Sequence, residues 1–402
     1  MTAQTVQLGD EGAPRRFDAL PLVCFGLLVA NVALLLVFSN GLIVGLDGRP
    51  APSDFLNVYG AGRLVLESQA PAAYDWDVLH ATENALVGRA VTTYFGWHYP
   101  PPFLAVAAAL ASLPYAAAFV AWFAVTLPLY LVTIRAIVRA PVGWLVAGAF
   151  PALLPNIIPG QNGFLTAALI GGTLVLLERQ PWLAGVCLGL LTYKPQFGIL
   201  FPLLLVAGGY WRAIASATVT AVALALGSVA LFGTATWAAF FHWLPLTSQA
   251  LFSDGAHHAD WSKFQSLFAL ARMLGGGATF AWTLQLALSA VTALLLCATW
   301  RDTRIAFPLK AAATATAVLL ATPYVYLYDL TVLAVAVAFL LRHAMNRGFA
   351  RAETIGLGLV TALVLVMPFF EVPVGLPAAA IVAALIARRA LGEELRPLAR
   401  AY

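Results

Sequence analysis

Asp54 combines a residue type and a position that suit acid–base chemistry. It stands in the run Pro52-Ser53-Asp54-Phe55, shortly after the first long apolar stretch and at the start of a segment with helical spacing of its apolar residues. Ser or Asp at a helix start often accepts hydrogen bonds from backbone N–H groups, so helix capping is one interpretation. If Ser53 fills that role, the Asp54 carboxylate is left to take a proton from a hydroxyl group at the membrane interface.

Lys194 is a lone cation within a long apolar stretch, between Tyr193 and Pro195. An ammonium group near the centre of a bilayer costs about 2.5–3.5 kcal/mol, so such a residue needs a partner or a polar cavity. Two interpretations stay open. Lys194 binds an anion such as a phosphate, or it pairs structurally with a carboxylate from a loop.

A second polar group lies further along the chain, around residue 263. Lys263, Gln265 and Arg272 offer hydrogen-bond donors for a phosphate, and His257 could assist them. As parts of a solvated loop, the same residues would need no functional explanation. Four other polar or aromatic residues flank apolar segments on the same predicted side of the membrane and are candidate contacts to a sugar or phosphate: His98, Tyr99, Gln161 and Asp329.

Two motifs that resemble metal sites are set aside. Asp75-Trp76-Asp77 has the spacing found in metal-dependent nucleotide-sugar transferases, but no soluble α/β domain accompanies it. His257 and His258 are adjacent, which is not a recognised spacing of zinc ligands. The chain also lacks a phosphate-binding P-loop and a dinucleotide fingerprint. We therefore expect neither a bound metal nor a cofactor.

The composition requires that these residues be positioned by membrane-spanning helices. Of 402 residues, 61% are apolar and only 10% are charged, whereas soluble domains carry about 25% charged residues. Apolar runs of roughly 20 residues recur between Leu20 and Ala387, which excludes a soluble enzyme. The net charge of +4 is interpreted as a signal of topology and not of nucleic-acid binding.

The predicted fold class is therefore an all-α polytopic integral membrane protein with about twelve transmembrane helices. The first span follows Arg15 and Arg16 and lacks a cleavage site, so we expect it to be retained. The three cysteines lie inside apolar segments and are expected to be small core residues. The expected spans are residues 21–40, 116–134, 142–158, 163–177, 182–193, 196–209, 213–232, 278–299, 306–321, 330–342, 355–370 and 373–387.

The distribution of Lys and Arg predicts which loops face the cytoplasm. If the short apolar piece 103–113 does not cross the membrane, most of the 22 Lys and Arg residues fall on one side. We therefore expect a single domain, 1–402, with a first outer loop over 47–102 and a second over 233–278. The six basic residues left outside are Arg49, Arg63, Arg89, Lys194, Lys263 and Arg272.

The first outer loop is expected to contain two amphipathic helices on the membrane surface. Apolar residues recur at helical spacing between Phe55 and Leu66, with Arg63 and Glu67 on the opposite face. A weaker stripe begins at Leu79. The alternative is that both helices only cap the bundle.

Four groups of residues, in order along the chain, together resemble a known family. They are Asp54 with Tyr59 and Tyr74-Asp75; Tyr99-Pro100-Pro101-Pro102-Phe103 with Leu113-Pro114-Tyr115, Ala118 and Trp122; Gly160-Gln161 with Ala184-Gly185 and Lys194-Pro195; and Gln265-Ser266 with Arg272 and Thr322-Pro323-Tyr324. With these residues the sequence resembles the GT-C glycosyltransferases, specifically glycosyltransferase family 87. That family includes the polyprenyl-phosphate-mannose-dependent α-1,2-mannosyltransferase of phosphatidylinositol mannoside synthesis.

The resemblance implies a GT-C fold and an inverting, metal-independent transfer of a sugar, mannose being favoured, from a polyprenyl-phosphate donor. It implies that Asp54 corresponds to the family's first-loop catalytic aspartate. The acceptor would be a lipid or glycan, membrane lipids would surround the protein, and nucleic acid would not be a partner. We expect an integral protein of a bacterial inner (plasma) membrane with its site facing the periplasm or exterior. A polytopic transporter or lipid flippase is the alternative, as is a GT-C enzyme using another lipid-linked pentose or hexose.

Overall fold

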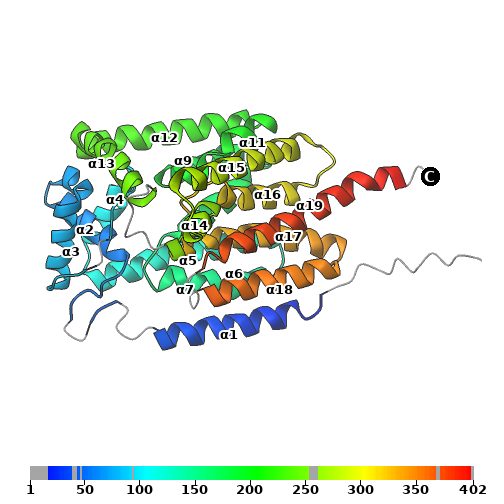
Figure 1. Ribbon diagram of the computed structural model, residues 1–402, viewed down its shortest axis with the longest axis horizontal. Helices are drawn as coiled ribbons and strands as arrows, with labels where there is room; N and C mark the ends of the chain where they lie inside the picture. The colour runs from blue at the N-terminus through cyan, green and yellow to red at the C-terminus, as the bar shows by residue number, and fades with distance from the viewer. Residues whose placement is uncertain are drawn as a thin grey trace, which may run out of the picture.

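The described residues of the computed structural model form a bundle of helices (Figure 1). These residues are 17–38, 43–45, 48–92, 95–252, 261–367 and 372–399, and among them the only β-structure consists of isolated bridges. Six helices in this part of the chain are long and apolar enough to cross a membrane: α1 (Leu20–Phe38), α5 (Tyr115–Val138), α12 (Trp211–Phe232), α15 (Ala278–Arg301), the segment Leu327–Arg347, which contains α17 (Thr331–Arg347), and α19 (Gly375–Ala399) over its first part, Gly375–Gly392.

Shorter helices, several of them apolar, lie between these long ones. Proline residues divide several of them, because proline removes a backbone donor and obstructs the preceding turn. The predicted span 142–158, for example, is broken near Pro151 and Pro155 into short pieces. The shorter helices are α6 (Gly143–Ala149), α7 (Leu154–Ile157), α8 (Gly163–Leu176), α9 (Pro181–Leu190), α10 (Pro195–Gly198), α11 (Phe201–Ala207), α16 (Phe307–Leu320) and α18 (Arg351–Val366).

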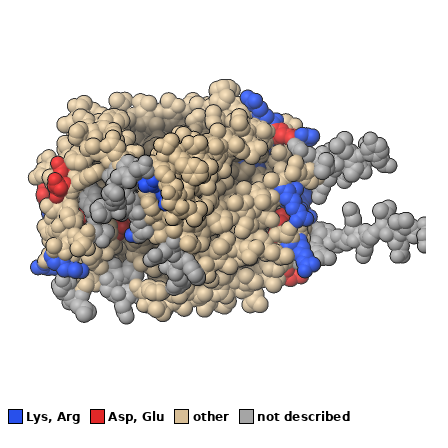
Figure 2. Space-filling view, in the orientation of Figure 1, with Lys and Arg blue, Asp and Glu red and all other residues tan. Residues whose placement is uncertain are grey.

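The connections between these helices lie at two opposite ends of the bundle (Figure 1). We call one the loop end, because it carries residues 48–92, 95–114, 233–252 and 261–277. We call the other the basic end, because Arg139, Arg179, Arg304 and Arg347 lie in or beside its turns. Figure 2 shows Lys and Arg side chains gathered at the basic end, with a broad uncharged surface along the middle of the bundle. The long connections and most of the basic turns thus lie at opposite ends of the bundle, and which end faces the cytoplasm stays a prediction.

The centre of the bundle is the segment Leu327–Arg347, of which 89% is buried over its most apolar window. By contrast, only 11% of the corresponding windows of α1 and α12 is buried. Large apolar side chains such as Leu36 and Leu226 are exposed on these outer helices. Such a continuous apolar surface is stable against lipid tails and not against water.

Four helices cap the loop end: α2 (Phe55–Leu66), α3 (Trp76–Val87), α4 (Phe103–Ala111) and α13 (Thr234–Phe252). The prediction that α2 is an amphipathic surface helix is wrong, because every residue from Phe55 to Gly62 is buried. Both faces of α2 are covered, since α4 and α5 pack on one side while α3 and the turn Ala70–Tyr74 pack on another. The stripe of apolar residues thus reports packing onto the bundle. The more exposed α3 keeps only Leu79, Glu83 and Val87 buried.

The nine-residue helix α4 remains at the loop end and packs along α2. At 1.5 Å per residue it is about 14 Å long, which is too short for a hydrocarbon core of about 30 Å. Close contact is possible because Gly62 of α2 faces the Ala107 carbonyl oxygen of α4. A Cβ atom at Gly62 would overlap that oxygen and lie 2.7 Å from the Ala111 Cβ.

We therefore expect Gly62→Ala to separate α2 from α4 and to destabilise the fold by about 1–3 kcal/mol. The matched control is Gly26→Ala in α1, where nothing lies within 4 Å of the added Cβ. That control should be neutral or slightly stabilising, because Ala favours helix over Gly. Thermal unfolding of both variants in lipid nanodiscs tests this, and equal melting temperatures would contradict the close packing.

Candidate active site

Asp54 is at the N-cap position of α2, but its side chain makes no capping hydrogen bond. Its Oδ2 atom instead accepts a hydrogen bond from Gln161 Nε2 at 2.7 Å. Ser53 does not cap the helix either, because its hydroxyl lies 3.3 Å from the Tyr115 hydroxyl. The helix-capping interpretation of Asp54 is therefore wrong, and the carboxylate is held toward the bundle by one amide.

The turn that carries Gln161 is locked against the start of α2. The Phe55 N–H donates to the Pro159 carbonyl at 3.0 Å, and the Trp122 indole N–H donates to the Gln161 carbonyl at 3.1 Å. Gly160 between them has φ of +78°, and a Cβ there would lie 2.5 Å from the Phe55 Cβ. Only glycine satisfies both the left-handed backbone and the close approach. Asp54 and Gln161 are thus held together by main-chain geometry.

Burial raises the pKa of the Asp54 carboxyl above its ordinary value of 3.8. The hydrogen bond from Gln161 and the nearby positive charge of Lys263 both lower this pKa again. A carboxylate with a raised pKa is a stronger proton acceptor than an ordinary aspartate, and its two partners favour the ionised form. The structure thus brings together three residues that the sequence placed far apart.

Glu83 is a second carboxyl group near Asp54, and the sequence analysis did not single it out. It is fully buried on α3, where its Oε2 atom accepts from the Phe95 N–H at 3.5 Å and lies 3.5 Å from His80 Nδ1. Burial, with a contribution from the charge of Asp54, raises its pKa to about 8. The available signal was its place in the stripe Leu79, Glu83, Val87, whose four-residue spacing puts all three on one helix face.

Lys194 and Asp329 form a buried ion pair, with 2.7 Å between Lys194 Nζ and Asp329 Oδ1. The other carboxylate oxygen accepts from the Tyr326 N–H at 3.0 Å, and Lys194 Nζ lies 4.8 Å from the centre of the Tyr328 ring. Only 3% of Lys194 and 1% of Asp329 is exposed. Of the two interpretations of Lys194, the geometry therefore favours the structural pairing over a direct contact with an anion. The Asp329 carboxylate, a candidate contact to a sugar or phosphate, is likewise occupied by this pair.

A chain of hydrogen bonds connects the turn at Gln161 to the one that carries Lys194. Asn162 Nδ2 donates to the Tyr99 hydroxyl at 2.6 Å, and the Tyr193 hydroxyl donates to the Asn162 carbonyl at 3.3 Å. Tyr193 also shares a 2.6 Å hydrogen bond with the Thr166 hydroxyl. Tyr99 is buried and its hydroxyl is committed to this network, so its role in the structure is to join the first loop to α8 and α9.

Two of the remaining candidates, Lys263 and His98, differ in charge. Lys263 is exposed and close enough to Asp54 to lower the pKa of its carboxyl. Burial lowers the pKa of the His98 imidazole to about 4, so this ring is neutral near pH 7. The role of His98 as a contact to a sugar or phosphate stays a prediction, and a neutral imidazole would make that contact through a hydrogen bond.

Gln265 and Arg272 are occupied by contacts within the chain. The Gln265 amide oxygen accepts from the Gly375 N–H at 2.8 Å, and its Nε2 donates to the Ser262 carbonyl at 3.1 Å. Arg272 donates to the Gly276 carbonyl at 3.1 Å and lies 5.4 Å over the Trp261 ring. These contacts hold the second loop in place and do not bring either side chain to Asp54. His257 lies outside the described residues.

The Asp75-Trp76-Asp77 motif is explained by helix capping. Asp75 Oδ1 accepts from the Asp77 and Val78 N–H groups at 3.0 and 3.2 Å, which satisfies two free donors at the start of α3. Within the described ranges, no group of three or more His, Cys, Asp or Glu residues is placed to hold a metal ion.

The site is thus a half-buried carboxylate at the loop end of an apolar helical bundle, with an exposed lysine whose charge lowers its pKa. Comparison with known families matches residues 97–323, more than half of the chain, to glycosyltransferase family 87. The chain belongs to this family, so it is a GT-C type membrane glycosyltransferase and not a transporter. Comparisons with curated proteins and with solved structures gave no significant match.

The family match begins at Trp97, so it includes Gln161, Lys194 and Lys263 but not Asp54. The assignment of Asp54 to the site therefore depends on its geometry. Its link to Gln161 connects it to the matched region.

The Lys194–Asp329 pair predicts a non-additive effect on stability. Lys194→Met should destabilise the protein by about 3–5 kcal/mol, because it leaves the Asp329 carboxylate buried without its partner. The double variant Lys194→Met/Asp329→Leu should regain most of that loss. Arg63→Met is the control, because its ion pair with Glu67 is exposed and worth at most about 1 kcal/mol. Additive losses in thermal unfolding would argue against the pair as a structural unit.

Proposed function

We propose that this protein transfers a sugar, with mannose favoured, from a polyprenyl-phosphate donor to a lipid or glycan acceptor, with inversion at the anomeric carbon. The observation that carries the proposal is the Asp54 carboxylate, which is held by Gln161, influenced by Lys263 and free of any capping role. Membership of glycosyltransferase family 87 supports a transfer of this type.

In this mechanism Asp54 is the general base. The acceptor O–H gives its proton to the carboxylate while its oxygen forms a bond to the anomeric carbon. On the opposite face of the sugar, the bond from that carbon to the phosphate oxygen breaks, and the phosphate leaves with the electron pair. A single displacement of this kind inverts the configuration. The proton remains on Asp54 until it passes to the released phosphate or to water.

Lys263 is the residue that best suits the departing phosphate. It is exposed, unlike Lys194, and its charge acts on Asp54, so a donor phosphate beside it would be within reach of the base. Its ammonium group would stabilise the negative charge that develops on the phosphate as the bond breaks. Lys194 and Asp329 then act as positioning residues that fix the turns below the site.

The excess of Lys and Arg at the basic end supports a cytoplasmic location for that end. Asp54 would consequently face the periplasm or exterior of the membrane in which the protein lies, which we propose is a bacterial inner membrane. A polyprenyl donor can reach this level from within the bilayer, because its apolar tail is compatible with the exposed apolar surface of the bundle. We further propose that the helices form about twelve passes of the GT-C type.

The Asp54→Asn variant tests the base directly. It should fold and insert as the unchanged protein does, but lose about 100- to 10,000-fold in kcat, because an amide cannot accept the acceptor's proton. The measurement is the transfer of radiolabelled mannose from polyprenyl-phosphate mannose to a lipid extract, with a chelator present. Asp77→Asn, an exposed carboxylate in the same loop, is the control and should keep full activity. Near-normal turnover by Asp54→Asn would remove this residue from the mechanism.

The Gln161→Leu variant should change the pH dependence of the reaction. In the unchanged protein, kcat/KM should fall on the acidic side with a midpoint above 3.8, the ordinary value, because burial raises the pKa of Asp54. Loss of the Gln161 hydrogen bond raises that pKa further, so the acidic midpoint should move to higher pH while activity recovers at alkaline pH. The control is Gln180→Leu at the basic end, which should leave the midpoint unchanged. If Gln161→Leu also leaves the midpoint unchanged, Gln161 does not act on the base.

A further inference from the structure

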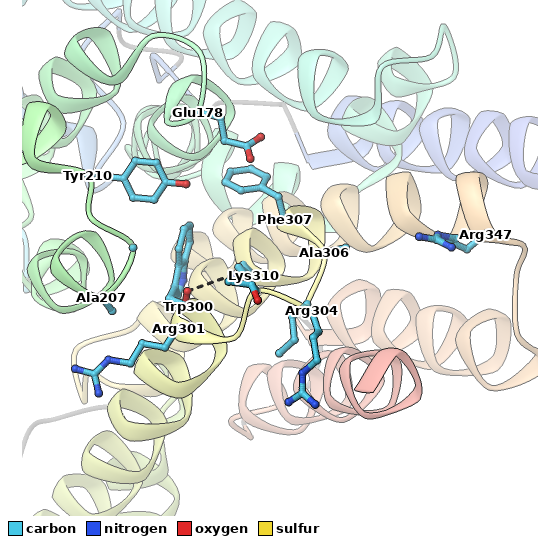
Figure 3. A pocket seen from close by; sticks show the side chains of 13 residues that line it. Glu178, Ala207, Tyr210, Trp300, Arg301, Arg304, Ala306, Phe307, Lys310 and Arg347 are labelled. Carbon is cyan, nitrogen blue, oxygen red and sulfur yellow. Dashed lines mark hydrogen bonds between the residues drawn. The ribbon is translucent and has the colours of Figure 1, made fainter. Parts of the chain in front are cut away.

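A cavity of about 990 Å³ opens at the basic end, at the opposite end of the bundle from Asp54 (Figure 3). Its walls are aromatic, since Tyr210 and Phe307 each meet the Trp300 ring edge-on with 5.9 Å between ring centres. Figure 3 shows the Tyr210 hydroxyl and the Glu178 carboxylate pointing into this space. The proposed transfer reaction uses none of these residues.

Cations outnumber anions around the cavity. Lys310, Arg347, Arg301 and Arg304 line it, against a single carboxylate from Glu178. Arg304 is held by Asp302 at 2.7 Å, and both Arg301 and Arg304 extend away from the centre along the rim (Figure 3). Lys310 is half-buried, and its Nζ donates one hydrogen bond to the Trp300 carbonyl at 3.2 Å, which leaves further donor capacity on the ammonium group.

Two helices also begin at this cavity without a side-chain cap. Tyr210 is the N-cap residue of α12 and Ala306 is that of α16, and neither side chain accepts a hydrogen bond from the first turn of its helix. The first backbone N–H groups of a helix carry a partial positive charge that favours an anion. At α12 the Trp211 N–H already donates to the Gly209 carbonyl, and at α16 Pro308 has no N–H while the Leu309 N–H donates to the Ala306 carbonyl. The backbone donor that lines the cavity is therefore the Phe307 N–H at the start of α16.

The size and surroundings of the cavity indicate a lipid and not a small ion. Its volume is at the upper end of the range of about 300–1,000 Å³ that holds drug-sized ligands, well beyond what one phosphate fills. Beside it, α11 and the start of α12 expose Leu203, Val206 and Trp211. A headgroup in the cavity would leave its acyl chains along this apolar surface. Basic pockets between helices at the cytoplasmic side of a membrane are suited to such headgroups.

We propose that this cavity binds the headgroup of a membrane phospholipid. The phosphodiester accepts hydrogen bonds from Lys310, from Arg347 and from the start of α16, while Glu178 accepts from a hydroxyl or ammonium group of the same headgroup. The rim residues Arg301 and Arg304 contact the surrounding anionic surface of the bilayer. This site is separate from the proposed transfer site and does not depend on it.

Native mass spectrometry of the delipidated full-length protein tests the proposal. The probes are phosphatidylglycerol, phosphatidylethanolamine, diacylglycerol with the same acyl chains, and inorganic phosphate. Both phospholipids should bind. Arg347→Gln and Lys310→Gln should each raise the Kd of both phospholipids at least about tenfold, because each variant removes a charge-assisted hydrogen bond. Glu178→Gln should weaken the binding of phosphatidylethanolamine more than that of phosphatidylglycerol, because the ammonium group of phosphatidylethanolamine loses a charged acceptor.

Arg63→Gln at the loop end is the matched control and should leave phospholipid binding unchanged. Arg347 is exposed, so its replacement tests the site even if Lys310→Gln does not fold. Equal binding of diacylglycerol, or phospholipid binding that neither cation variant weakens, would overturn the proposal. Displacement of the phospholipid by inorganic phosphate at equal concentration would assign the cavity to free phosphate instead and would overturn the lipid assignment.

Discussion

Lys194 and Asp329 are separated by 135 positions in the chain, yet they lie in contact because neither charge is stable alone among apolar helices. Their contact joins the turn between α9 and α10 to the start of the segment Leu327–Arg347, which is the most buried of the long helices. The Tyr326 N–H completes the carboxylate's hydrogen bonds, so the backbone before this central helix is also fixed.

The turn at Gln161 is attached to the same framework through Asn162, Tyr99 and Tyr193. Because α8 has 14 residues and is only about 21 Å long, its polar first turn lies within the bundle and not at its surface. Helix α2 is docked onto this turn, and Asp54 thereby reaches a half-buried position against the bundle. The short helices and the buried helix α2 together create the surroundings that raise the pKa of this carboxyl, as its proposed role as a base requires.

The two ends of the bundle offer different chemistry for reasons of charge. At the loop end, a half-buried carboxylate and an exposed lysine suit the proposed reaction, in which a proton leaves the acceptor and negative charge develops on a phosphate. At the basic end, cations and the start of α16 surround a cavity that suits a phosphodiester that stays intact. The apolar sides of α1 and α12 suit a lipid environment, which would supply both of the proposed ligands.

The sequence alone indicated the class of the protein and predicted which loops lie on the same side of the membrane. Both depend on local properties, because the length of an apolar run determines whether it can span the bilayer and the Lys and Arg beside it determine its orientation. It also identified Asp54, Lys194 and Asp329 as unusual, since isolated charges next to apolar runs need an explanation. It could not show that Lys194 and Asp329 bind each other, because such a pairing depends on how distant helices pack.

Only the tertiary structure decided the roles of the remaining residues. The apolar stripe of α2 predicted one buried face, but packing of α3, α4 and α5 buried the helix on nearly all sides. Gln161 became the partner of Asp54, Gln265 joined the chain to Gly375, and burial left His98 neutral. A side chain's hydrogen-bond partner and its pKa depend on neighbours from distant segments, and those neighbours exist only once the chain has folded.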